Sequence, residues 1–161
     1  MRSKNKDFVK INQSEIKKAE NLKIGIVVSE WNIDITSNLH KGAVDKLNEL
    51  GLKNESIKSS WVPGAFELVY ACKELSKKKF DAIIAIGCVI KGETDHYDFI
   101  CNSVSNGLME LNASGSTPVI FCVLTDHNID QSIARSGGEK GNKGSEAAIA
   151  AVKMATFDKV I

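Results

Sequence analysis

The feature that most constrains the fold of this chain is a regular alternation of short apolar runs with segments of helical periodicity. Four segments are predicted to be strands: Lys23–Ser29, Ser56–Trp61, Asp81–Gly87 and Val119–Leu124. The third contains the Ile-rich run Ala82–Ile86, and the fourth is almost purely apolar. Runs of this kind are typical of strands that are buried on both faces.

The segments between these strands carry apolar residues at helical spacing. Helices are expected over Ile35–Leu50, Ala65–Leu75 and Ile100–Leu111, in a short stretch ending at Arg135, and over Ser145–Phe157. Gly51 is expected to end the first of them. Strands that alternate with helices predict right-handed βαβ units, and hence a parallel sheet with helices on both faces. We therefore expect an α/β fold around a four-stranded parallel sheet.

Length and charge narrow the class of protein further. The chain has 161 residues, which fits one domain over 22–161. The segment before it, over 1–21, is rich in lysine, and its composition is typical of a mobile tail. A net charge of +1 gives no reason to expect a nucleic acid or an anionic membrane as partner. The sequence shows no apolar run long enough to span a bilayer and no signal-peptide core near its start, so a cytoplasmic location is expected.

Four cysteines, Cys72, Cys88, Cys101 and Cys122, show no CxxC pairing. Two fall in helical patterns and two in strand patterns, so packed free thiols in a reducing cytosol are the better interpretation. The same spacing gives no indication of a metal site.

The unusual side chains of the chain follow directly after predicted strands. Trp31, Pro63–Glu67, Lys91–His96 and Thr125–Asn128 each come after one of the four strands. Because the carboxyl ends of parallel strands lie at one edge of the sheet, these four loops are expected to meet there, where ligands bind in open α/β sheets.

Several of these residues have chemistry that suits a binding site. His96 titrates in the range that serves proton transfer near neutral pH, although a surface loop histidine is the alternative. Trp31 either packs in the interior or offers a wide π face to a planar heterocycle. In Pro63–Glu67, proline sets the turn, glycine lets the backbone approach a ligand, and the first N–H groups of the next helix are free to bind it.

Three features bear on phosphate binding. Glu93-Thr94 is expected to open a helix whose N-terminal N–H groups favour an anion, with Thr94 or Asp95 as its N-cap. Arg135 and Lys143 either bind phosphate or are solvated surface charges. Arg135 lies roughly ten residues past its strand, about 15 Å along a helix, so a neighbouring subunit's site is more accessible to it than its own. Gly137–Gly144 is neither a Walker A loop nor a GxGxxG motif.

Four segments resemble the lumazine synthase family, the penultimate enzymes of riboflavin synthesis. They are Ser29-Glu-Trp-Asn32, Trp61-Val-Pro-Gly-Ala-Phe-Glu67, Gly87-Cys-Val-Ile-Lys-Gly-Glu-Thr-Asp-His-Tyr-Asp98, and Val119–Gly144 with its Gly-Asn-Lys-Gly ending. Together they cover nearly everything after residue 21 in order. The resemblance implies a flavodoxin-like three-layer sandwich that condenses 5-amino-6-(D-ribitylamino)uracil with 3,4-dihydroxy-2-butanone 4-phosphate, without a metal or redox cofactor.

The resemblance also assigns residues to roles. It implies His96, Arg135 and Lys143 as catalytic residues, with His96 moving protons and the other two facing the phosphate. Binding of the ribitylaminouracil is implied for Trp31, Ala65, Phe66, Glu67, Cys88, Val89, Ile90 and Phe121. Binding of the butanone phosphate is implied for Glu93, Thr94 and Arg135. The family often has Phe where this chain has Trp31, a small residue at Glu93, and Glu at His127, so the roles of Glu93's side chain and of His127 stay open.

An assembly is implied as well. Members of the family form pentameric rings, some stacked in pairs and some closed into sixty-subunit shells, and riboflavin synthase is a candidate partner. The resemblance implies that each site receives Phe121, Arg135 and Lys143 from the neighbouring subunit. It also implies that residues 1–21 add a strand to a neighbour's sheet, with Phe8, Val9 and Ile11 as the apolar anchors. The alternatives are a flavin-binding carrier and a non-catalytic shell protein of the same fold.

Overall fold

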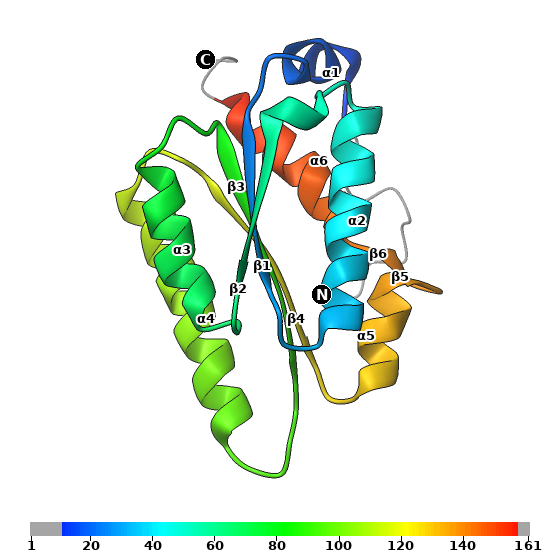
Figure 1. Ribbon diagram of the computed structural model, residues 1–161, viewed down its shortest axis with the longest axis vertical. Helices are drawn as coiled ribbons and strands as arrows, with labels where there is room; N and C mark the ends of the chain where they lie inside the picture. The colour runs from blue at the N-terminus through cyan, green and yellow to red at the C-terminus, as the bar shows by residue number, and fades with distance from the viewer. Residues whose placement is uncertain (1–10, 158–161) are drawn as a thin grey trace.

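Four parallel strands form a central sheet between two layers of helices in the computed structural model, which describes residues 11–157 (Figure 1). The strands are β1 (Ile24–Ser29), β2 (Ile57–Val62), β3 (Ala82–Ile90) and β4 (Val119–Asp126), in the spatial order β2-β1-β3-β4. Each neighbouring pair is parallel. The predicted three-layer α/β fold and its four-stranded sheet are therefore confirmed.

Two long helices cover each face of the sheet. α2 (Ile33–Glu49) and α6 (Lys143–Ala155) pack together on one face, and α3 (Glu67–Ser76) and α4 (His96–Ser114) pack together on the other (Figure 1). α5 (Ile129–Arg135) follows β4, and a short 3-10 turn, η1 (Asn54–Ser56), precedes β2. α2 ends just before Gly51, as its sequence predicts. None of the helices within residues 11–157 is long and apolar enough to cross a membrane.

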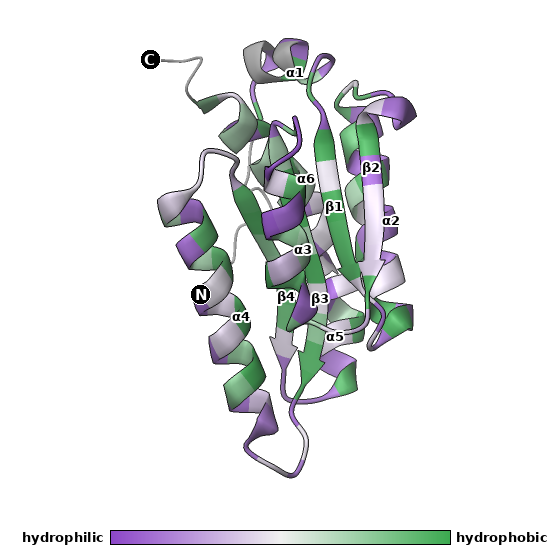
Figure 2. Cartoon of the chain, turned by 60° about the vertical axis from the view of Figure 1, so that its left-hand side comes forward, coloured by the Kyte–Doolittle hydropathy of each residue, from purple (hydrophilic) through white to green (hydrophobic). Residues whose placement is uncertain are grey.

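The core lies on both faces of the inner strands. Ile24, Ile26 and Val28 of β1 pack with α2 and α6, whereas Val27 packs with α3 and α4. All four are fully buried, and burying each such side chain stabilises the fold by about 1.5–3 kcal/mol. Figure 2 shows β1 and β3 as mostly hydrophobic ribbons, which is the pattern that burial on both faces favours.

β2 is an edge strand and differs from the others. Of its residues only Ile57 is buried, and the run from Lys58 to Trp61 is exposed. Its ribbon is correspondingly pale in Figure 2. β4 forms the opposite edge of the sheet, and Phe121 is exposed there.

The N-terminal segment is partly helical, which its sequence did not predict. α1 (Gln13–Ala19) precedes β1, with Ala19 and Leu22 buried against the core. For residues 13–19 the interpretation as a mobile tail is therefore wrong, because they form a helix that ends with Ala19 packed against the core. Of the three apolar anchors, Ile11 is half-buried against the core, and Phe8 and Val9 lie outside the described residues.

Two further local predictions need correction. Residues of the expected loop Gly137–Gly144 pair as a short antiparallel hairpin, β5 (Ser136–Gly138) with β6 (Gly141–Asn142). α4 begins at His96 rather than at Glu93-Thr94, which form the turn before it. Asp95 occupies the N-cap position, but its side chain makes no capping hydrogen bond.

Candidate active site

The four strand-end loops meet at the carboxyl edge of the sheet, as the sequence predicts. The loops after β1 and β2 are joined by two backbone hydrogen bonds, from Glu30 N–H to Val62 O at 2.8 Å and from Trp31 N–H to Pro63 O at 3.2 Å. The loop after β3 is joined to the end of β4 by Lys91 N–H, which donates to Asp126 O at 3.0 Å. Backbone bonds therefore link the loops in pairs along this edge.

Trp31 lies on the surface at this edge. Its side chain is 72% exposed, so the alternative of interior packing is wrong. A Cβ added at Gly64 would lie 3.4 Å from Trp31 Cδ1 and 3.0 Å from Glu67 Oε2. Glycine at this position thus lets the indole and the Glu67 carboxylate approach the same stretch of backbone.

The residues that follow Gly64 differ in which of their groups are accessible to a ligand. Ala65 is buried in the core between the sheet and the helices α3 and α4, so only its backbone is available to a ligand. Phe66 is 57% exposed, and Glu67 is the first residue of α3. In β3, Cys88 is buried, and Val89 and Ile90 are half-buried where the strand ends.

A side chain that the sequence analysis did not single out connects two of these groups. Asn32, next to Trp31, donates from Nδ2 to the backbone oxygen of Cys88 at 2.9 Å. Asn32 has a φ of 57°, in the left-handed region. Asparagine adopts this conformation more easily than most residues. The asparagine in the Ser-Glu-Trp-Asn segment was therefore the one sequence signal that could have predicted a tight turn after Trp31.

His96 is the first residue of α4 and is exposed. The adjacent Tyr97 contacts His127, with the two rings edge to face and their centroids 6.3 Å apart. Burial is the main cause that raises the pKa of Tyr97. His127 therefore lies close to the helix start that carries His96.

The sequence also did not predict a polar cluster of Cys88, Asp126 and Ser132, which joins β3, β4 and α5. The Asp126 carboxylate accepts a hydrogen bond from Ser132 Oγ at 2.8 Å, and Ser132 Oγ accepts one from Cys88 Sγ at 3.4 Å. Burial raises the pKa of the Cys88 thiol, the bond to Ser132 opposes this, and the charge of Asp126 raises it further. Cys88 therefore stays a neutral thiol near pH 7 and acts here as a donor rather than a nucleophile.

Arg135 belongs to the same cluster, which corrects an expectation. Its Nε lies 3.8 Å from Asp126 Oδ1, at the end of β4, rather than about 15 Å beyond the strand. The reason is that α5 is only seven residues long and its last residue extends a long side chain back along the helix. Because the Cys88 side chain packs on the α2 and α6 face and contacts Ser132, α5 lies on that face. α4, which begins with His96, packs on the opposite one.

Phe121 and Lys143 are not brought to this edge. Phe121 lies five residues before Asp126 on β4, about 16 Å along the strand. Lys143 is the first residue of α6, and its Nζ contacts both oxygens of Glu146 at 2.8 and 2.7 Å. Burial raises the pKa of Cys122, in the middle of β4, to about 12; the charge of Glu146 raises it further, and the charge of Lys143 opposes the rise. α6, which begins with Lys143, packs against β4.

The Gly-Asn-Lys-Gly sequence has a structural role in placing Lys143. Asn142 Oδ1 accepts from Gly144 N–H at 2.8 Å and so caps α6, while its Nδ2 donates to Asn38 O at 2.9 Å. A Cβ at Gly144 would lie 1.9 Å from Leu39 O. Only glycine permits this contact between α2 and α6, and the contact sets where α6 begins.

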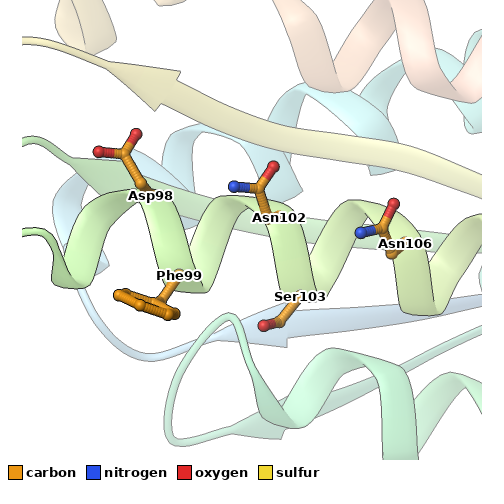
Figure 3. A pocket seen from close by; sticks show the side chains of 5 residues that line it. All are labelled: Asp98, Phe99, Asn102, Ser103 and Asn106. Atoms are coloured by element: carbon orange, nitrogen blue, oxygen red, sulfur yellow. The ribbon is translucent and has the colours of Figure 1, made fainter.

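A shallow pocket lies elsewhere, along the outer face of α4. Figure 3 shows its lining side chains, all from that helix: Asp98, Phe99, Asn102, Ser103 and Asn106. Phe99 is exposed, and the pocket contains no residue of the strand-end loops. The four cysteines are free thiols, as predicted, and Cys72, Cys88 and Cys122 are buried.

Comparison with known proteins identifies the family. The family model of 6,7-dimethyl-8-ribityllumazine synthase matches residues 21–159. The chain belongs to this family. It is 50% identical over 161 residues to the 6,7-dimethyl-8-ribityllumazine synthase of Christiangramia forsetii, covering 99% of this chain and 96% of that protein. It is 50% identical to the protein of that name from Flavobacterium johnsoniae, over 96% of this chain and 82% of the relative.

A third relative gives the same result. The 6,7-dimethyl-8-ribityllumazine synthase of Porphyromonas gingivalis is 49% identical over 142 residues, which is 88% of each chain. The lumazine synthase family match therefore covers the whole sheet and all four strand-end loops, and the resemblance drawn from the sequence motifs is confirmed.

Proposed function

We propose that this chain condenses 5-amino-6-(D-ribitylamino)uracil with 3,4-dihydroxy-2-butanone 4-phosphate to form 6,7-dimethyl-8-ribityllumazine, phosphate and water. This is the penultimate step of riboflavin biosynthesis, and the chain is a transferase. The observation that carries the proposal is the family match over residues 21–159. It favours the enzyme over a flavin carrier or a non-catalytic shell protein.

The pyrimidine substrate is assigned to the loops after β1, β2 and β3. Trp31 and Phe66 offer exposed aromatic faces, and aromatic rings stack well on planar heterocycles. Glu67 stands beside Gly64, where its carboxylate can accept hydrogen bonds from ribityl hydroxyls. The backbone of Ala65 and the end of β3, from Cys88 to Ile90, complete this part of the site.

The phosphate substrate is assigned to the start of α4 and to the cations. Glu93 and Thr94 form the turn before α4, whose first N–H groups and positive dipole end favour an anion. Arg135 and Lys143 supply positive charge, and His96 moves protons as the imine forms and the ring closes. Much of the rate enhancement comes from holding two substrates in one geometry.

The site is proposed to be shared between neighbouring subunits. Within one subunit, His96 and Arg135 start from opposite faces of the sheet, and Phe121 lies about 16 Å from its carboxyl edge. Large apolar side chains are exposed on β4 and α5, at Phe121, Ile129 and Ile133, and around the loops after β1 and β2, at Trp31, Ile33 and Phe66. Exposed apolar side chains of this kind suit burial against another subunit, and a head-to-tail contact is the kind that closes a ring.

The assembly is proposed to be a pentamer, alone, in stacked pairs or in a sixty-subunit shell. Riboflavin synthase is the proposed protein partner, and the location is proposed to be the cytoplasm. Mass measurement of the purified protein distinguishes the three assemblies.

The function is tested by mixing both substrates with the purified protein and recording lumazine fluorescence. Fluorescence should rise faster than in a protein-free control, and should not rise when either substrate is omitted. A protein that is yellow as purified and forms no lumazine would instead be a flavin carrier, and a colourless, inactive assembly would be a shell protein.

A further inference from the structure

Asp126 lies at the centre of the polar cluster at the end of β4. It is 7% exposed, and its Oδ2 accepts from Ser132 Oγ at 2.8 Å. Its Oδ1 lies 3.8 Å from Arg135 Nε, an ion-pair distance rather than a hydrogen bond. Its backbone oxygen accepts from Lys91 N–H at 3.0 Å. One residue therefore connects the loop after β3, the end of β4 and the guanidinium of Arg135.

Arg135 is held from a second direction. Its Nη1 donates to Gln131 O at 2.8 Å, within α5. Gln131 is itself anchored at the start of α5, because its Oε1 accepts from His127 N–H at 3.0 Å and its N–H donates to Asn128 Oδ1 at 3.1 Å. The guanidinium is thus restrained through Nε by a charge and through Nη1 by a carbonyl, while the side chain stays 36% exposed.

A nearly buried carboxylate beside a phosphate-binding arginine needs a physical reason, because it repels the phosphate. The benefit is orientation: arginine loses much rotamer freedom when it binds an anion, and a fixed partner reduces that loss. An arginine held on its Nε side presents its Nη groups for bidentate contact with phosphate oxygens.

We propose that Asp126 is a positioning residue for the phosphate-bearing substrate and acts by holding the guanidinium of Arg135 at the carboxyl end of β4. The inference rests on the proposed function. It assigns Asp126 no contact with the substrate and no proton transfer. Ser132 supports the arrangement by fixing the second carboxylate oxygen, and Cys88 in turn donates to Ser132.

The test compares the kinetics of wild type with Asp126→Ala, Asp126→Asn, Arg135→Ala and the double variant Asp126→Ala/Arg135→Ala. Asp126→Ala should raise KM for the butanone phosphate about tenfold, as expected for one misaligned charge-assisted contact, and leave KM for the ribitylaminouracil nearly unchanged. Asp126→Asn keeps the shape and a hydrogen-bond acceptor but loses the charge, so its rise should be smaller, about threefold. The matched control is Asp130→Asn, an exposed carboxylate in the first turn of α5, the helix that carries Arg135, and it should behave as wild type.

The double variant separates positioning from general stability. If Asp126 acts through Arg135, replacing it should change nothing further once Arg135 is absent. An equal effect of Asp126→Ala in both backgrounds, equal rises in both KM values, or a wild-type KM in Asp126→Asn would each overturn the proposal. If Asp126→Ala does not fold, Asp126→Asn decides alone, with assembly checked by mass.

Failure of the inference and failure of the proposed function give different results. A wild-type protein that forms no lumazine refutes the function. Calorimetric titration with inorganic phosphate, a product of the reaction, then still shows whether Asp126→Ala weakens an anion site that depends on Arg135. A wild type that forms lumazine, with an Asp126→Ala variant that matches it, keeps the function and refutes the role of Asp126.

Discussion

The side-chain amide of Asn32 donates a 2.9 Å hydrogen bond to the backbone oxygen of Cys88, which ties the loop after β1 to the end of β3. The bond crosses between two neighbouring strands of the sheet and starts from a residue with a φ of 57°. Trp31 directly precedes Asn32 in the chain. The position of the exposed indole relative to the end of β3 therefore depends on one side chain.

Asn32→Ala should lower stability by about 1–2 kcal/mol, because it loses this bond and places alanine in the left-handed region. The thermal midpoint should fall by several degrees at fixed protein concentration, since about 2–4 °C corresponds to 1 kcal/mol in a chain of this size. KM for the ribitylaminouracil should rise. Asn32→Gly removes the bond without the backbone penalty and should lose roughly half as much stability. Equal stability of the alanine variant and wild type would contradict the role of the bond.

His96→Ala should lower kcat and flatten its pH dependence while substrate binding changes little. One proton-transfer group typically contributes ~10²–10⁴-fold, and less where the uncatalysed reaction is already feasible. The matched control is His40→Ala, which removes a histidine of α2 whose Nε2 lies 2.8 Å from Ser59 Oγ. The measurement is kcat across pH for all three proteins. An unaltered pH profile in His96→Ala would remove His96 from the mechanism.

Trp31→Ala should weaken the ribitylaminouracil and any bound flavin together, because both would stack on the same π face. The measurements are KM for the pyrimidine and fluorescence titration with riboflavin. Trp61→Ala is the control, since Trp61 is also partly exposed but packs edge-on to His40, with the ring centroids 5.7 Å apart. Flavin that binds Trp31→Ala with wild-type affinity must occupy a different place.

A shared site predicts complementation between two variants that each impair every site of their own assembly. One carries Trp31→Ala and His96→Ala, and the other carries Arg135→Ala. Unfolded and reassembled together in equal amounts, they form mixed rings in which some interfaces combine an intact Trp31 and His96 with a neighbour's intact Arg135. Random assembly of a head-to-tail ring produces that order at roughly a quarter of the interfaces. Lumazine formation should return to about that fraction of wild type.

The same mixture supplies its own control. Combining the two variants without unfolding should restore nothing, because we expect each of the proposed rings to keep its own subunits unless it is unfolded. Native mass spectrometry establishes that refolded rings contain both chains. Mixed rings without activity would mean that Arg135 serves the site of its own subunit, near the Asp126 that holds it.

Much of the fold could be predicted because its signals are local. The runs Ala82–Ile86 and Val119–Leu124 are too apolar for an exposed segment, and helical spacing recurs between the strands. α1 and the β5–β6 hairpin escaped prediction because they are short. A helix of seven residues is not stable by itself and here depends on burial of Ala19 and Leu22.

The sequence by itself determined the four strands and their parallel direction, because both follow from short-range patterns and the geometry of βαβ units. It also determined that the loops with Trp31, Glu67 and His96 lie at one edge of the sheet, since each of them follows a parallel strand. Only the tertiary structure decided that Asn32 reaches Cys88, that Trp31 is exposed, and that Arg135 turns back to Asp126. These depend on where α5 and the loops pack in three dimensions. The number of residues between Asp126 and Arg135 does not predict their contact, because the Arg135 side chain extends back along α5 toward the end of β4.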